Sequence, residues 1–430
     1  MKQYLDACLR ETEQSETLFV NELSQTKERQ GDLVYKFGFG QSPFYPPTHI
    51  VDIVKKEAHR KEYMAVQGHP KLREAVAKFH RDVDKIDVSA DRVIVGPGSK
   101  MLIFSVMACF KQADVFLVTP SWVSYEPQAK LAGHPVTRIQ TCYEDRWRLT
   151  PELLMDACES RQNKEIPIIM VLNYPGNPDG LTYTENELKA IADVAKKYHV
   201  LVISDEIYGL LHYKGDHYSL ARYYPEGTIV TSGLSKWCGA GGWRLGVALL
   251  PKSLDDQFKS CLIGIGSETY SCVTCAIQEA AVEAYNNTEE IQSYLAHQRR
   301  ILSLAGQYVY RVLKEKDVWV HSPQGGFYVN PDFTPYQVAL AERGISTCDQ
   351  LCSQLLSDTG VVLLPGTAFG YSDNRLVTRL AFVDFDGKNA LSASEDIGLD
   401  QPLDRAFLDQ YLPKIGAGVD TLANWLPSKV

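Results

Sequence analysis

The chain has 430 residues, of which 45% are hydrophobic and 23% are charged, and its formal net charge is −9. This composition is that of an ordinary folded globular protein, and the length exceeds what one hydrophobic core usually organises, so we expect two domains. The negative charge argues against a nucleic-acid binder or a binder of anionic membranes. An anionic small-molecule ligand would therefore need a local basic pocket.

The N-terminus and the cysteines are typical of a cytoplasmic protein. The first residues, MKQYLDACLRETEQSE, lack the apolar core of a secretory signal. No stretch of about 18 uninterrupted apolar residues suggests a membrane span. The cysteines are scattered, and the CxxC spacing of Cys272 and Cys275 has no second pair or histidine pair nearby. We expect reduced thiols and no metal, with redox or metal use of this pair as the alternative.

Residues 90–250 alternate short apolar runs with helical patterns. Near-continuous apolar strands are buried on both faces, which is typical of a largely parallel sheet in an α/β fold. The segment TENELKAIADVAKKYH predicts a helix, and Thr184 and Glu187 at its start have the spacing of a capping box. The expected strands lie in DRVIVGP, DVFLVTP, IPIIMVLNYP, HVLVISDE, GTIVTSG and GVALLP.

The pattern changes after about residue 290. A long helical stretch, EEIQSYLAHQRRILSLAGQYVYRVLKE, leads into strand-like pieces at GGFYVNPDF, VVLLPG and LVTRLAFV. We expect a large domain over residues 46–290 and a smaller α+β domain formed by residues 1–45 together with 291–430. The acidic, turn-rich segment 384–405 is interpreted as a solvated insertion or surface loop.

Polar motifs follow several of the expected strands, at the sheet edge where open α/β folds bind ligands. GPGSK opens a helix, so that Gly98 permits close approach and the helix N-terminus offers N–H groups to a phosphate. NYPGNPDG holds Asn177 on a rigid turn. The alternatives for these two motifs are ordinary Gly-rich and Pro/Gly turns.

Two further motifs contain candidate ionised groups. In SDEIY, Asp205 ends a buried strand, where a carboxylate needs a cation such as a protonated pyridine nitrogen. Tyr208 would lie on the same side if a helical turn starts there, and the alternative for Asp205 is a helix N-cap. In TSGLSKWCGAGGWRLG, Lys236 is a candidate nucleophile for a Schiff base, and the guanidinium of Arg244 could bind a phosphate through two N–H groups. The alternative is that Lys236 and Arg244 are ordinary surface residues.

From about residue 30 to 385 the chain resembles the fold-type I pyridoxal-phosphate (PLP) enzymes, specifically the class I/II aminotransferases. The resemblance rests on the motifs NxPxNPxG, DEIY, SKxxxxxGWRLG, GGFYVNPDF and TRLAF in this order. It implies the PLP-transferase fold, in which a mostly parallel seven-stranded sheet is flanked by helices. It also implies the cofactor pyridoxal 5′-phosphate.

The resemblance further implies roles for individual residues. Lys236 would form the Schiff base with PLP and move the substrate proton, and Asp205 would pair with the pyridine N–H. Asn177 and Tyr208 would bond to the phenolic oxygen. The groups expected around the ring face and the phosphate are Trp122, Gly98, Ser99, Lys100, Ser235 and Arg244.

Three more roles concern the substrate and the assembly. Arg379 would hold the substrate α-carboxylate, and the segment of Gly40 would close over the substrate, which also contacts Asn177 and Trp122. Tyr63 would reach the phosphate of a neighbouring subunit, which implies a homodimer with shared active sites. Asp179 replaces the family's usual threonine, which we interpret as a peripheral change in the turn, and Gly233 stands where many relatives have serine.

The function expected from this resemblance is ping-pong transamination between an amino acid and a 2-oxo acid such as 2-oxoglutarate. Aspartate is the first candidate donor, followed closely by aromatic amino acids and alanine. A carbon–sulfur lyase or another PLP enzyme of the same fold would keep all of these residues. A regulator with an aminotransferase-like domain and a protein with an inactive site are the less favoured alternatives.

Overall fold

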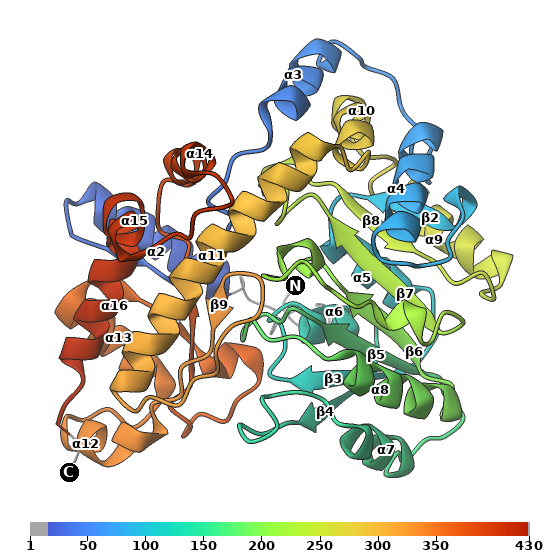
Figure 1. The fold of residues 1–430 in the computed structure, drawn as a ribbon. Coiled ribbons are helices and arrows are strands. Elements are labelled where there is room, and N and C mark those ends of the chain that lie inside the picture. The colour runs from blue at the N-terminus through green and yellow to red at the C-terminus, as the bar shows by residue number, and fades with distance from the viewer. Residues whose placement is uncertain (1–15, 429–430) are drawn as a thin grey trace, which may run out of the picture.

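The computed structural model describes residues 16–428, and its centre is a seven-stranded sheet (Figure 1). The strand order is β2-β8-β7-β6-β5-β3-β4, and β8 alone runs antiparallel to its neighbours. The strands are β2 (Val93–Gly96), β3 (Asp114–Thr119), β4 (Val136–Gln140), β5 (Ile168–Asn173), β6 (Leu201–Asp205), β7 (Thr228–Gly233) and β8 (Gly246–Leu249). The expected mostly parallel seven-stranded sheet is confirmed.

Helices cover both faces of this sheet, so its strands are apolar on both sides. On one face, Val115 and Leu117 pack with the helices α5 (Ser99–Ala108), α6 (Tyr125–Leu131) and α9 (Asp256–Thr269). On the other face, Phe116 and Met170 pack with α7 (Pro151–Glu159) and α8 (Glu185–Lys197). The capping box of α8 is confirmed, because Thr184 and Glu187 exchange side-chain and backbone hydrogen bonds.

The C-terminal elements pack around the long helix α11 (Glu289–Glu315) beside the seven-stranded sheet (Figure 1). They include an antiparallel sheet of order β11-β12-β9, and β1 pairs parallel with β10. This pairing joins part of the N-terminal segment to the C-terminal part; of residues 1–45, which we expected in the smaller domain, residues 1–15 lie outside the described residues. The strands are β1 (Tyr35–Lys36), β9 (Tyr328–Val329), β10 (Val361–Val362), β11 (Leu364–Pro365) and β12 (Thr378–Ala381).

The remaining α-helices complete the two parts of the molecule. They are α2 (Glu16–Arg29), α3 (Thr48–Glu57), α4 (Pro70–Asp82), α10 (Cys275–Ala284), α12 (Gln337–Glu342), α13 (Cys348–Thr359), α14 (Gly387–Ile397), α15 (Arg405–Tyr411) and α16 (Pro413–Trp425). Within residues 16–428, no helix is both long and apolar enough to cross a membrane.

The interpretation of residues 384–405 as a solvated loop is wrong for half of the segment. Residues Gly387–Ile397 form α14, which Asp386 caps by accepting the amides of Lys388 and Asn389. Its small face packs on α11, and Ser394 bonds to the buried ring of His297 at 2.8 Å. The acidic composition obscured the alanine and serine residues that face the core.

Candidate active site

A cavity of about 560 Å³ lies at the carboxyl ends of the central strands. The N-terminal segment and the strands β9 and β12 complete its wall, so both parts of the molecule contribute to it. Its polar and aromatic lining includes Gly40, Ser99, Lys100, Trp122, Tyr125, Asn173, Asn177, Asp205, Tyr208, Ser235, Lys236, Arg244, Tyr328 and Arg379. All the predicted site residues except Gly98 and Tyr63 therefore line one cavity.

Asp205 ends β6 in register with Asn173 of β5 and Thr231 of β7. Its carboxylate, 2% exposed as a residue, accepts hydrogen bonds from Tyr125 Oη at 2.7 Å and Thr231 Oγ1 at 3.2 Å. Burial raises the pKa of Asp205 to about 6, although both hydroxyl groups act in the opposite direction. Within residues 16–428 it forms no ion pair, so a cationic group of a ligand would be favoured here.

Lys236 follows β7 and its ammonium group lies inside the cavity. Nζ donates to the carbonyl of Gly40 at 3.0 Å and lies 5.5 Å from the centre of the Tyr208 ring. Burial, followed by repulsion from Arg379, lowers the pKa of Lys236 to about 8. A lysine with such a pKa is partly neutral near physiological pH, which is the form that attacks a carbonyl.

Arg379 in β12 faces the same cavity from the C-terminal part. Its guanidinium donates to Asn177 Oδ1 at 3.0 Å and to the carbonyl of Gly38 at 2.5 Å. The residue is 1% exposed, and its Nε has no hydrogen-bond partner among the described residues. A buried guanidinium with an unused N–H can bind a carboxylate through its fork.

Two tyrosines join the N-terminal segment to the sheet. The hydroxyl groups of Tyr208 and Tyr328 are 3.0 Å apart, and Tyr328 Oη lies 3.4 Å from the Gly40 carbonyl. Burial raises the pKa of Tyr208 well above its usual value, so its hydroxyl stays protonated and able to donate. A side chain at position 40 would overlap the Tyr328 hydroxyl, because an added Cβ would lie 1.9 Å from it.

The opposite end of the cavity is suited to an anion. Gly98, with a φ of 87°, precedes the N-terminus of α5, where Ser99 begins the helix. Arg244 crosses this turn and donates to the carbonyls of Pro97 and Gly241. A Cβ on Gly98 would lie 2.2 Å from the Arg244 guanidinium, so the glycine is required for this approach.

An aromatic wall lies between these two ends. The ring of Trp122 packs edge-on against Tyr125, with centroids 5.3 Å apart and planes at 82°. The Lys100 ammonium lies 4.9 Å from the centre of the Trp122 ring. Burial and the nearby Arg244 lower the pKa of Lys100.

These groups match the chemical features of PLP. The Asp205 carboxylate suits a protonated ring nitrogen, the α5 N-terminus with Ser99, Ser235 and Arg244 suits a phosphate, and Trp122 offers a stacking face. The Lys236 amine is positioned in the same cavity. The donors and acceptors present therefore fit the cofactor.

Two predicted residues lie outside the cavity lining. Gly98 shapes the anion end from behind, through its contact with Arg244. Tyr63 is 89% exposed on the connection between α3 and α4, so its predicted reach into a neighbouring subunit stays a prediction.

Asp179, expected to be a peripheral change in the turn, lies outside the cavity lining but not at the surface. Asp179 is buried, and its carboxylate forms an ion pair with the buried Arg148. It also accepts the amide of Leu181 at 2.9 Å, so it does shape the turn as expected.

Ten of the residues that line the cavity were not predicted, and the side chains of three of these, Tyr125, Asn173 and Tyr328, form hydrogen bonds to predicted residues. Each stands inside a motif that the sequence offered: SWVSY, the first position of NYPGNPDG, and GGFYVNPDF. Asn173 uses its amide to bind the Asp205 carbonyl and its Oδ1 to accept the Asn177 amide. A polar residue directly after a buried strand was the signal that could have identified it.

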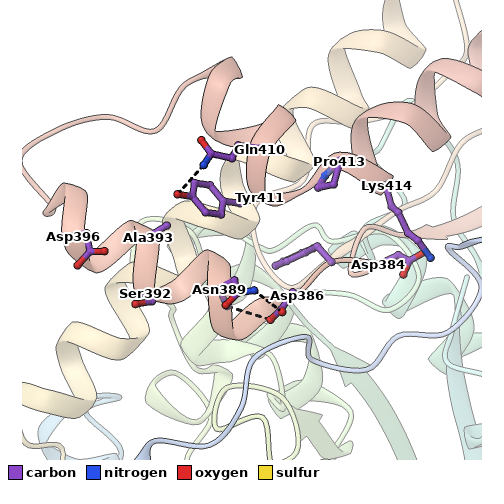
Figure 2. A pocket seen from close by; sticks show the side chains of 11 residues that line it. Asp384, Asp386, Asn389, Ser392, Ala393, Asp396, Gln410, Tyr411, Pro413 and Lys414 are labelled. Carbon is purple, nitrogen blue, oxygen red and sulfur yellow. Dashed lines mark hydrogen bonds and ion pairs between the residues drawn. The ribbon is translucent and has the colours of Figure 1, made fainter.

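A second cavity, of about 660 Å³, lies between α14 and the α15–α16 region (Figure 2). It contains none of the predicted site residues. Two of its three acidic groups have partners in the protein, since Asp384 accepts the Lys36 amide and Asp386 caps α14 and bonds to Asn389. It is therefore not a candidate for the predicted chemistry.

Comparison with known proteins agrees with this geometry. The family model "Aminotransferase class I and II" matches residues 34–384. The chain is 33% identical to aspartate aminotransferase of Geobacillus stearothermophilus over 377 residues, covering 84% of this chain and 90% of the relative. It is 30% identical to asparagine–oxo-acid transaminase of Streptococcus mutans, covering 85% and 91%.

Solved structures with a similar fold are also aminotransferases. The structure of Thermus thermophilus aspartate aminotransferase with maleate superposes with a TM-score of 0.81 at 26% identity, covering 91% of this chain and 98% of that one. These relatives are aminotransferases, so the lyase alternative is not favoured.

Proposed function

Because the chain belongs to the class I and II aminotransferases, we propose that the cavity binds PLP through Lys236 and transfers amino groups from aspartate to a 2-oxo acid. The observation that carries this proposal is the convergence of Lys236, Asp205 and Arg379 on one cavity. They come from β6, the segment after β7, and β12, so their meeting is a property of the fold.

When bound, PLP supplies an electron sink that stabilises negative charge at the substrate Cα. The Asp205 carboxylate keeps the ring nitrogen protonated, and Tyr125 and Thr231 hold that carboxylate in place. Asn177 and Tyr208 provide polar groups at the same side of the cavity, and we assign them to the phenolic oxygen. Ser99, Ser235 and Arg244 hold the phosphate.

Lys236 has two tasks in this proposal. Its Nζ would hold the cofactor when it is bound, and as a free amine it would accept and return the proton of the substrate Cα. The lowered pKa of about 8 leaves a useful fraction of the amine neutral at the working pH. Arg379 orients the substrate by gripping the α-carboxylate, which directs the Cα–H toward Lys236.

Aspartate as donor is supported by a further cation in the cavity, beside Lys236, Arg244 and Arg379. With Arg379 on the α-carboxylate and Arg244 on the phosphate, the Lys100 ammonium beside Trp122 is available for a side-chain carboxylate. The sequence predicted Lys100 at the cofactor phosphate. A role at the phosphate would affect all donors, whereas a role at the substrate side chain would affect aspartate. The names of the relatives also support a dicarboxylate or its amide as substrate.

The test measures transamination from aspartate, alanine and phenylalanine to 2-oxoglutarate in wild-type enzyme and in Lys100→Met. We expect aspartate to be the best donor and the variant to lose at least about tenfold in kcat/KM for aspartate alone. An equal loss of kcat/KM for all donors, together with weaker PLP binding, would show that Lys100 binds the cofactor phosphate instead. No activity with aspartate in the wild-type enzyme would contradict the substrate proposal.

The assembly and location are also proposed. A homodimer with shared sites is supported by the exposure of Tyr63 and by the exposed position of Arg244 at the anion end. A cytoplasmic location is supported by the free state of all cysteines in residues 16–428, including Cys272 and Cys275. The division into residues 46–290 and residues 1–45 with 291–430 agrees with the separate sheets.

A further inference from the structure

Next to the turn that carries Asn177, a buried ion pair joins this turn to a distant segment. The side chains of Arg148 and Asp179 are 6% and 4% exposed, and the guanidinium Nη2 contacts the carboxylate Oδ2. Arg148 lies between β4 and α7, 31 positions before its partner. Neither residue lines the main cavity, so neither can touch a ligand bound there.

The pair holds Leu181, whose carbonyl closes the turn. The Leu181 carbonyl accepts the Gly176 amide at 2.8 Å and Arg148 Nη1 at 3.2 Å. The Leu181 amide donates to Asp179 Oδ1 at 2.9 Å. Arg148 and Asp179 therefore hold the two backbone groups of one residue as well as each other.

The surrounding packing leaves this arrangement little freedom. A Cβ on Gly176 would lie 2.2 Å from Asp179 Oδ1, so the turn is pressed against the carboxylate. On the other side, the Arg148 guanidinium lies 5.1 Å from the centre of the Tyr183 ring, and its Nε donates to the Arg146 carbonyl. Because the Arg148 guanidinium is held in place, it restricts the movement of the turn that carries Asn177.

The turn places Asn177 beside Arg379, the residue assigned to the substrate α-carboxylate. The Asn177 amide is tied to Asn173 Oδ1 at 2.9 Å, and its side-chain oxygen accepts Arg379 Nη1 at 3.0 Å. We propose that Arg148 and Asp179 are positioning residues, which hold Asn177 against Arg379 and thereby set the orientation of the α-carboxylate grip. This inference rests on the proposed role of Arg379.

The test uses PLP-loaded enzyme with Asp179→Asn, Arg148→Met and the double variant. We expect each to raise the KM for aspartate and the Kd for the unreactive dicarboxylate maleate about tenfold, with kcat changed less than about threefold. Because each single substitution already removes the ion pair, the KM and the maleate Kd of the double variant should be no higher than those of either single variant. Arg148→Lys keeps a cation without the fork and should fold with an intermediate KM.

The matched control is the ion pair of Arg161 and Asp114, which is also buried and lies at the opposite, amino end of β3. Asp114→Asn should lower thermal stability while KM and the maleate Kd stay as in the wild type. Wild-type KM in folded Asp179→Asn and Arg148→Met would overturn the inference, as would an equal rise in KM in Asp114→Asn. Should those two variants fail to fold, wild-type KM in Arg148→Lys would overturn it.

The variant Arg379→Lys separates a failure of the positioning role from a failure of the proposed role of Arg379 at the α-carboxylate. If Arg379→Lys leaves the Kd for maleate unchanged, the assignment of the α-carboxylate grip itself is wrong. If Arg379→Lys weakens maleate binding but the changes at 148 and 179 do not, only the positioning role is wrong.

Discussion

Asp205 illustrates how single residues acquire their chemistry from the fold. The register of three parallel strands places it beside Thr231 and Asn173, and Tyr125 reaches it from α6. The hydroxyl groups of Tyr125 and Thr231 orient the carboxylate without neutralising it, and the Asn173 side chain donates to the main-chain carbonyl of Asp205. Burial therefore dominates and raises its pKa from 3.8 to about 6.

This pKa predicts a pH dependence of cofactor binding. Below about pH 6, Asp205 of the cofactor-free enzyme is neutral and no longer attracts a protonated ring nitrogen. The Kd of pyridoxamine phosphate, relative to that of Asp205→Asn, should rise about tenfold per pH unit below this value. Calorimetric titration between pH 5 and 8 measures it, and parallel curves for the two proteins would refute the assignment.

Residues that act from the end of a strand could be predicted from the sequence, whereas their partners could not. Lys236, Asp205 and Arg379 stand in or directly after apolar runs, where the chemistry of an α/β sheet is expected. Tyr125 lies 80 positions before Asp205, and only the closed fold brings them together. The same holds for the ion pair of Asp179, whose partner Arg148 has no local signal.

At the scale of elements, the N-terminal segment and strand β9 form one side of the site. Gly40 offers its carbonyl to Lys236, and the missing side chain leaves room for the Tyr328 hydroxyl. Long apolar strands were predicted correctly, but the edge strand β4 was missed because Arg138 and Gln140 are exposed and Ile139 is its one buried residue. Helix α14 was missed for the related reason that its buried face is small and its exposed face acidic.

Gly40→Ala tests the close approach of this segment. The new methyl group must displace the Tyr328 hydroxyl and break its hydrogen bond to Tyr208. We expect kcat/KM to fall at least about tenfold. Gly264→Ala is the control, because its Cβ would meet open space on α9. Equal activity of the two variants in steady-state assays would show that the approach has no functional role.

At the scale of the whole molecule, Arg244 at the anion end of the cavity and Tyr63 on the connection between α3 and α4 are both exposed in a single chain. An exposed aromatic residue of this size is well suited to a subunit interface. In the proposed dimer, each Tyr63 donates to the phosphate held by its neighbour. Each subunit would then contain a site that it cannot complete alone.

Hybrid dimers test this sharing. Tyr63→Phe should weaken pyridoxamine phosphate binding about tenfold, because a hydrogen bond to a charged group is lost. A hybrid of one Tyr63→Phe subunit and one Lys236→Ala subunit should contain one site with both residues intact. Activity should therefore exceed that of either parent dimer. A monomer in sedimentation, or no recovery in the hybrid, would refute shared sites.

The central claim is that Lys236 and its neighbours exchange amino groups through PLP. Rapid mixing of PLP-loaded enzyme with aspartate alone, without an oxo acid, tests it most directly. The account predicts a single loss of the visible cofactor absorbance, with one equivalent of 2-oxo acid per site and no ammonia, and no such change in Lys236→Ala. Unchanged absorbance in the wild type, or continuous release of ammonia, would contradict it.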